Sequence, residues 1–332
     1  MNAHEVNVKG TMKAARRAGA EAVVNLAQTR AWHVTAYEFS ALVDLDPVLT
    51  EIFFQQYKQV PENLIGTIFG RRDSSKAKET DLRIGSFADP QLWKGQVYYD
   101  EPTEDWEITY AHRHLTLGFK VEKTLLEDMQ YGGIFDQASR LGISFARRRA
   151  KDAASVFNNA FATVTGYDAK TLIATDHPLS KSDSTAVSNS LGTKALTDQN
   201  LEDACVQLEG LGDDRGEETG AVATHLIVGR SLRQKALQLT GSMQTPEDAN
   251  NSINTHSNLT PLINPFITGK KWFVADAQMA QMVLKWYDRL GPEPEFGVDD
   301  DKSGTLMRSY FGRVRNSFGW SDWRFIVGSN AS

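Results

Sequence analysis

The sequence is short of cysteine, of long apolar runs and of excess positive charge, and each shortage excludes a class of protein. Its single cysteine, Cys205, rules out an intramolecular disulfide framework and a cysteine-rich zinc module. No apolar run approaches the roughly 20 residues that cross a bilayer, and residues 1–19 lack the apolar core of a secretory signal. The 36 Lys and Arg against 42 Asp and Glu give a net charge of −6, which does not fit a dedicated nucleic-acid binder.

The composition is that of a globular chain of two domains, or of one elaborated domain. Its 332 residues are 41% hydrophobic and 23% charged, which excludes a disordered or low-complexity protein. Residues 1–30 differ from the rest, because five Lys and Arg oppose two Glu there, a net charge of +3. We expect this basic arm to form a short helix with little apolar surface, which docks on a neighbouring subunit.

Two segments of the first half carry helical periodicity. Within residues 34–69, Asp46-Pro47 predicts a helix start, and the apolar side chains that follow form one stripe. Residues 134–163 carry apolar side chains three or four apart, after a short helical segment at 122–130. Thirty helical residues span about 45 Å, so the second segment predicts a long structural helix.

Residues 80–121 predict a long β-hairpin. Two extended runs flank turn-rich sequences at Phe87–Pro90 and Trp93–Gly95. In the returning run the apolar side chains change parity between Tyr110 and Leu115, so we expect the strand to bend there and to use different faces in its two halves.

The second half of the chain alternates helices and strands without repeating βαβ units. After a polar connection at 164–196, Thr197 or Asp198 can cap a helix that ends near Gly210. Strands are predicted at 222–228, 259–267 and 271–275, a short helix at 231–239, and antiparallel strands from residue 283 to the end. Together with the hairpin and the long helix, this order predicts an α+β fold.

A search for catalytic and ligand-binding motifs identifies no catalytic residue, cofactor site or metal site. Gly269-Lys270 lacks the flanking residues of a phosphate-binding loop. Residues 299–304 resemble part of a calcium-binding loop, but Tyr310 stands where the loop needs a glutamate, which favours a solvated turn. His112 and His114 share one face of a strand without a third ligand nearby, so ordinary histidines are favoured over a metal site.

Three further groups have a functional and a structural interpretation. Asp176-His177 resembles part of a catalytic pair, but a turn before Pro178 explains it more simply. Cys205 lies on the apolar stripe of its helix, which favours a buried small side chain over a nucleophile. The cluster at 147–151 can contact phosphates, although ion pairs with acidic neighbours are favoured.

Several short motifs follow one another in a familiar order along nearly the whole chain. They are Glu79-Thr80 with Gly85 and Trp93, Glu127–Gly132, Thr175-Asp176-His177-Pro178, His225–Val228 with Ser231-Leu232-Arg233, Trp272–Asp276, and finally Gly312–Arg315, Gly319-Trp320 and Val327–Asn330. This order resembles the major capsid protein of tailed phages, specifically the major head subunit of Mu-like phages.

The resemblance implies a Hong Kong 97-type fold, with five expected parts. They are an N-terminal arm at 1–70, an extended loop at 71–121, a peripheral domain with a spine helix at 122–194, an axial domain at 195–285, and C-terminal strands of the peripheral domain at 286–332. It also implies a coat subunit without catalysis, present as pentamers and hexamers in an icosahedral shell that encloses double-stranded DNA. Scaffold, portal and decoration proteins are possible further partners, with assembly in the bacterial host cytoplasm and no membrane.

Intersubunit contacts are expected from the arm and from the extended loop. The residues concerned are Lys13, Arg16, Arg17, Trp93, Lys94 and Trp106. Some relatives lose an N-terminal segment on maturation; since Met1 is present, we expect no such cleavage in this form.

Two alternatives remain open at this point. An encapsulin-type shell shares the fold but holds an enzyme cargo in place of DNA. A hydrolase or metal enzyme that uses His112, His114 or His177 would lose activity, but not assembly, on alanine substitution.

Overall fold

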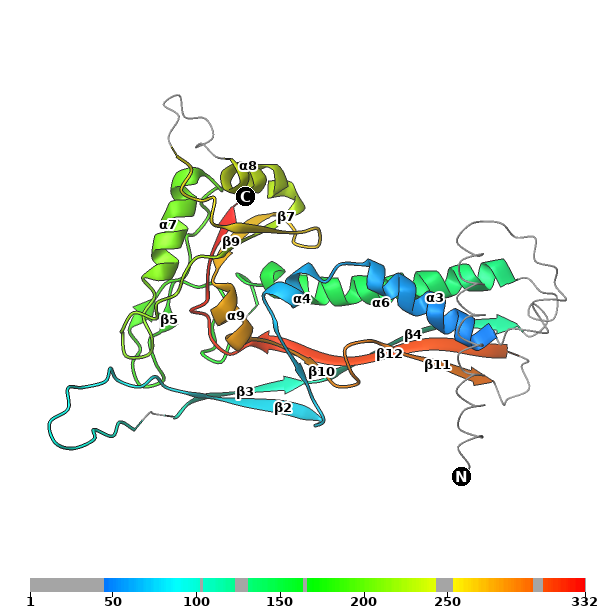
Figure 1. Cartoon of the computed structure of the whole chain (residues 1–332), viewed down its shortest axis with the longest axis horizontal. Helices are drawn as coiled ribbons and strands as arrows, with labels where there is room; N and C mark the ends of the chain where they lie inside the picture. The colour runs from blue at the N-terminus through cyan, green and yellow to red at the C-terminus, as the bar shows by residue number, and fades with distance from the viewer. Residues whose placement is uncertain are drawn as a thin grey trace, which may run out of the picture. The chain divides into compact units, whose positions relative to one another are not determined.

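The computed structural model describes residues 45–101, 104–122, 131–163, 166–242, 253–300 and 307–331. The chain divides into two compact units, and Figure 1 labels most of the helices and strands described below. Of the described residues, the small unit comprises 45–61, 114–122, 131–149, 292–300 and 307–314, and the large unit comprises 62–101, 104–113, 150–163, 166–242, 253–291 and 315–331. The long helix and one long strand contribute residues to both units. The predicted arm helix and most of the short helix predicted at 122–130 lie outside the described residues.

The small unit packs helices on an antiparallel strand pair. α3 (Leu45–Gln59) begins where Asp46-Pro47 predicted, and its buried stripe includes Leu49, Phe53 and Tyr57. α6 (Tyr131–Asn158) has 28 residues and confirms the predicted long helix, although it ends earlier than expected. β11 (Glu295–Asp300) pairs antiparallel with the first half of β12 (Met307–Trp320).

The core of the small unit is aromatic and closely packed. The Phe53 ring lies 5.9 Å from the ring of Phe145 and 5.1 Å from that of Phe296. A Cβ atom at Gly142 would lie 2.3 Å from the carbonyl oxygen of Phe53. The backbone of α3 therefore approaches α6 at a point where only glycine fits.

The large unit contains a four-stranded mixed sheet in the order β13-β9-β7-β8. Its strands are β7 (His225–Gly229), β8 (Thr260–Asn264), β9 (Lys270–Ala275) and β13 (Ile326–Ala331), of which only β7 and β8 are parallel. The surrounding helices are α4 (Asn63–Thr67), α7 (Asp198–Glu209), the 3₁₀ helix η1 (Arg230–Leu232), α8 (Arg233–Gly241) and α9 (Ala277–Val283). The side chains of Trp272 and Phe273 in β9 are fully buried.

The last strand, β13, belongs to this sheet. It pairs with β9 from Ile326–Ala275 to Ala331–Lys270. Phe325, Ile326 and Val327 form an apolar run that is completely removed from solvent, as expected for a strand inside a covered sheet.

β12 is also the centre of a five-stranded sheet. β10 (Leu284–Asp288) pairs with the second half of β12, β1 (Gly70–Asp73) pairs in parallel with β10, and β4 (Arg113–Glu122) also pairs with β12. A two-residue pair, β5 (His177–Pro178) and β6 (Ala186–Val187), forms a separate small sheet.

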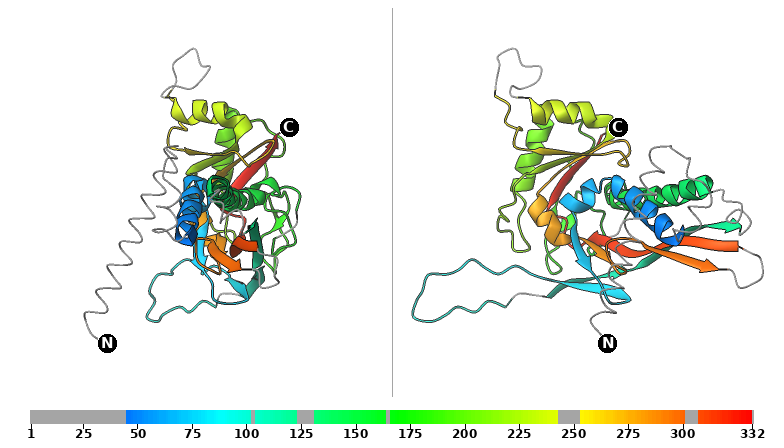
Figure 2. Two further views of the ribbon diagram at one scale, coloured as in Figure 1. Left: turned by 90° about the vertical axis from the view of Figure 1, so that its right-hand side faces the viewer. Right: turned by 45° about the vertical axis from the view of Figure 1, so that its right-hand side comes forward.

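The predicted hairpin is formed by β2 (Lys78–Ile84) and β3 (Glu104–Ala111). The parity change in the sequence corresponds to a real break, since β3 ends at Ala111 and β4 starts at Arg113 in a different sheet. The two-stranded part therefore ends at Ala111, within the predicted 71–121 segment. Figure 2 shows the connecting loop, in cyan, running out beyond the ends of β2 and β3.

Candidate assembly interface

The loop between β2 and β3 exposes an unusual amount of apolar surface. Residues 85–101 form neither helix nor strand. Leu92 is 87% exposed, Tyr99 83% and Trp93 71%. The other large exposed side chains of the loop are Phe87, Val97 and Tyr98. Because large apolar side chains gathered on one exposed segment mark a surface that another molecule covers, this apolar loop has the character of a docking element.

Both ends of the apolar loop are fixed to one turn of the large unit. The backbone N–H of Ser86 donates to Asp214 Oδ1 over 2.9 Å. On the other side, Asp100 Oδ2 accepts from the backbone N–H of Ala88 over 2.8 Å and forms an ion pair with Arg215 Nη2 at 2.8 Å. The loop thus leaves the body at a defined place, although its tip makes few contacts of its own.

These contacts keep the two aspartates charged at neutral pH. The hydrogen bond from Ala88, and then the Arg215 guanidinium, lower the pKa of Asp100. Partial burial works against ionisation of Asp214, but its hydrogen bonds with Ser86 outweigh burial and the pKa of this carboxyl is also lowered.

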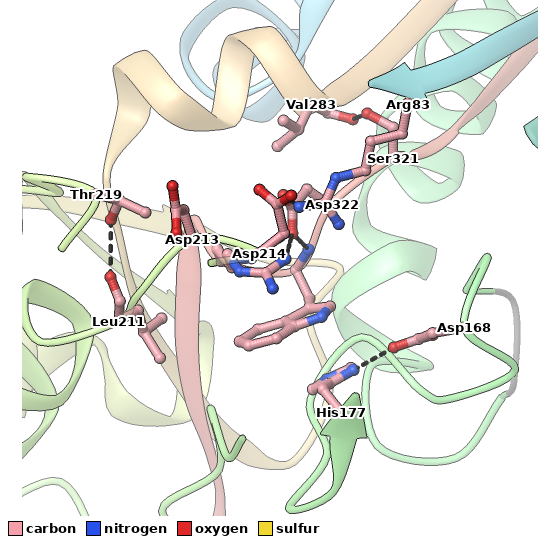
Figure 3. Close-up of polar contacts among 12 residues, drawn as sticks. Arg83, Asp168, His177, Leu211, Asp213, Asp214, Thr219, Val283, Ser321 and Asp322 are labelled. Carbon is pink, nitrogen blue, oxygen red and sulfur yellow. Dashed lines mark hydrogen bonds and ion pairs between the residues drawn. The ribbon is translucent and has the colours of Figure 1, made fainter. Parts of the chain in front are cut away.

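The root of the hairpin is held by a second, more buried charge cluster (Figure 3). Arg83 on β2 donates to Tyr167 Oη over 2.6 Å and pairs with Asp322 Oδ2 at 2.9 Å. Arg324 is only 2% exposed and donates to Asp322 Oδ1 over 3.1 Å. Its remaining donors reach the carbonyl oxygens of Gly212 and Leu179, at 2.8 and 2.6 Å. Every charge of this cluster has a partner, as buried charges require.

The structure places the predicted intersubunit residues in three different situations. Trp93 and Lys94 lie exposed in the apolar loop. Trp106 on β3 is partly buried, and its ring lies 4.9 Å from that of Tyr167 in the same chain, so one side of it is already occupied. Lys13, Arg16 and Arg17 lie outside the described residues.

The histidines and the cysteine that the sequence singled out have structural surroundings. His112 contacts two serine hydroxyls, and His114 is exposed. The described part of the chain contains no group of three His, Cys, Asp or Glu side chains placed to hold a metal ion. Burial raises the pKa of the half-buried Cys205 thiol to about 12, which makes it a poor nucleophile.

His177 pairs with a different aspartate from the one next to it in sequence. Its Nδ1 lies 2.6 Å from Asp168 Oδ2, whereas Asp176 pairs with Lys170. The His177 ring is fully buried and stacks on Trp323, with centroids 4.3 Å apart. A ring closed off from solvent on all sides supports packing, not reaction with a substrate.

The charge clusters around the loop are the site residues that sequence reasoning missed. Arg83 and Asp322 are 239 positions apart, and Ser86 and Asp214 are 128 apart. None of these residues belongs to a local motif, so no signal short of the fold itself could have paired them.

None of the described helices is both long and apolar enough to cross a membrane.

The fold is similar to that of several solved structures. The capsid of a native GTA particle matches with a TM-score of 0.55 and 13% identity, over 82% of this chain and 91% of that chain. The capsid of an empty GTA particle matches with a TM-score of 0.53 and 16% identity, over 82% and 90%. A virus-like particle from Pyrococcus furiosus matches with a TM-score of 0.50 and 12% identity, over 85% and 97%. At these identities the likeness concerns the fold alone.

The sequence itself identifies the family. No curated protein sequence matches this chain, but the family model described as phage capsid protein matches residues 109–329, about two thirds of it. The mixed helix and sheet fold agrees with that match. The chain therefore belongs to the phage capsid protein family.

Proposed function

We propose that this capsid protein assembles as pentamers and hexamers into an icosahedral shell around double-stranded DNA, and that its apolar loop makes the principal contact with the next subunit. The observation that carries the proposal is the exposure of Leu92, Trp93 and Tyr99 on a loop whose two ends are fixed. Burial of such side chains is worth about 25 cal/mol per Å² removed from water, so the loop supplies a strong driving force for association.

The division into arm, extended loop, peripheral domain and axial domain is part of the same proposal. The sheet of β7, β8 and β9 with α7 and α8 falls within residues 195–285, as proposed for the axial domain. β13 joins this sheet, so residues 326–331 are assigned to the axial domain as well. Placement among the Mu-like head subunits rests on the motif order alone.

The proposed role is structural, without catalysis. The net charge of −6 suits a shell that encloses DNA without binding it tightly, since phosphate binding needs an excess of cations. Scaffold, portal and decoration proteins are the further partners we expect, with assembly in the host cytoplasm.

Negative-stain electron microscopy of the full chain, combined with the ratio of absorbance at 260 and 280 nm, tests this function. We expect closed shells of uniform diameter that contain nucleic acid. Shells filled with a foreign protein would favour a cargo compartment of the encapsulin type. A monodisperse 36.9 kDa monomer at all salt and protein concentrations would contradict self-assembly.

The role of the apolar loop is tested by Trp93→Ala. We expect the variant to remain folded and to lose assembly, because most of the side chain is exposed in its own subunit. Met282→Ala is the matched control, since Met282 is a large apolar side chain, 67% exposed, on α9. Normal shells from Trp93→Ala would exclude the loop tip as the principal contact.

A further inference from the structure

His112 lies where both strands of the hairpin join the rest of the large unit. It is the one residue between the end of β3 and the start of β4. Ser74, the first residue after β1 on the way to β2, lies within hydrogen-bond distance of His112 Nε2, at 2.9 Å. Ser317 on β12 lies 3.0 Å from the other ring nitrogen, Nδ1. One imidazole ring therefore ties the roots of β2 and β3 to the central strand of the five-stranded sheet.

The hydrogen bonds determine which ring nitrogen carries the proton. Ser74 Oγ donates to Glu79 Oε1 over 2.7 Å, and a carboxylate accepts only. A hydroxyl has one hydrogen, so Ser74 Oγ must accept the hydrogen of His112 Nε2. His112 Nδ1 then accepts from the hydroxyl of Ser317. All of these bonds are satisfied at once only by the neutral ring protonated at Nε2.

A proton on Nδ1 disrupts this arrangement. Ser317 is 4% exposed, and the structure shows no other partner for its hydroxyl among the described residues. If Nδ1 becomes a donor, the hydroxyl hydrogen of Ser317 is left unsatisfied in a buried position, which is costly.

The charges that face the ring also decide against the protonated form. Arg315 on β12 and Arg289 after β10 repel an imidazolium, and Glu79 on β2 attracts one while it also pairs with Lys76. Burial and then Arg315 lower the pKa of His112, and Glu79 only partly compensates.

We propose that His112 is a pH-sensitive anchor of the hairpin. Its neutral ring holds the roots of β2 and β3 to β12, and its protonation weakens this attachment. A histidine with a lowered pKa in the attached state stabilises that state fully above its ordinary pKa of about 6.5. The stabilisation is lost as the pH falls from there toward the lowered value. Acid therefore loosens the β2–β3 hairpin.

Hydrogen exchange of the full-length chain tests this role of His112. Exchange is followed by mass spectrometry at about pH 7.5 and about pH 5, with times scaled for the intrinsic pH dependence of exchange. Peptides covering residues 78–84 and 104–111 report the hairpin, and a peptide from β9 reports the core. We expect the scaled exchange of the hairpin to rise about threefold or more at the lower pH while β9 stays protected.

Two variants make the result specific. His112→Gln keeps a donor toward Ser74 and an acceptor toward Ser317 without a titrating group, so its hairpin should exchange equally at both pH values. His114→Gln, two residues further on and exposed, should behave like the unaltered chain. The proposal is wrong if the unaltered hairpin shows no rise, or if His112→Gln shows the same rise. Light scattering on each sample ensures that all are compared in one assembly state, so the outcome is independent of the proposed shell function.

Discussion

At the scale of single residues, Arg324 is the most deeply buried member of the charge cluster at the hairpin root. Its side chain donates to the carbonyl oxygens of Gly212 and Leu179 and to the carboxylate of Asp322. Arg324→Met keeps most of the volume but removes the guanidinium donor from the two carbonyl oxygens, while Asp322 keeps its pair with Arg83. We expect the free energy of unfolding of unassembled subunits, measured in urea, to fall by about 3 kcal/mol.

Arg313→Met is the comparison for that measurement. Arg313 pairs with Glu295 where both side chains are nearly half exposed, and exposed ion pairs contribute about 1 kcal/mol or less. An equal loss from both variants would mean that burial gives Arg324 no special importance.

Cys205 is a second residue whose behaviour follows from its surroundings. Burial and the neighbouring Glu202 and Glu209 hold its thiol protonated, with a pKa of about 12. Since the thiolate is the reactive species, we expect modification by a disulfide reagent at about pH 8 to be about 100-fold slower in the folded chain than in urea. Rapid stoichiometric labelling of the folded chain would show that α7 opens readily or that the thiol is exposed.

At the scale of elements, the glycines of α6 differ in what they do. Gly142 lies where the backbone of α3 approaches, and an added Cβ would meet Phe53 O at 2.3 Å. Gly133→Ala in the same helix meets nothing within 4 Å. We expect Gly142→Ala to lower the free energy of unfolding by about 2 kcal/mol through overpacking, and Gly133→Ala to raise it by about 0.5–1 kcal/mol through helix propensity. Thermal unfolding of both variants checks the opposite signs, and a stabilised Gly142→Ala would refute the close helix contact.

The elements that sequence could predict are those with local signals. Asp46-Pro47 marked the start of α3, and Thr197 caps α7 through Asn200 N. The parity change after Tyr110 located the break between β3 and β4. The α+β class was predicted from the order of these elements, and the family from the order of short motifs along the chain.

What sequence could not predict depends on pairings between distant segments. β13 looks like any other C-terminal strand until its partner β9 is known. His177 stands beside Asp176 in sequence, but its partner is Asp168, because the turn between them folds back. The loop contacts of Asp214 and Arg215 depend equally on the complete fold. For these residues the sequence shows which side chains are able to pair, but not which of them lie close together in the fold.

At the scale of the whole molecule, the distribution of charge matters more than its sum. The chain carries −6, and residues 1–30 carry +3, so the remaining residues carry −9. A basic arm can therefore bridge to the acidic surface of a neighbouring subunit, or line the shell and face DNA. These two roles differ in whether they need nucleic acid.

We expect bridging, and neutralisation of the arm tests it. Lys13→Gln, Arg16→Gln and Arg17→Gln together remove the arm's net charge, so the nucleic-acid-free chain should need a higher subunit concentration to form shells. Its assembly should also respond less to salt, because ions screen such attractions over about 10 Å at 0.1 M. The charge-matched control carries Lys120→Gln, Arg230→Gln and Arg233→Gln, three exposed cations of the body. If the arm variant assembles like the control without nucleic acid but packages less of it, the arm faces DNA and does not join subunits.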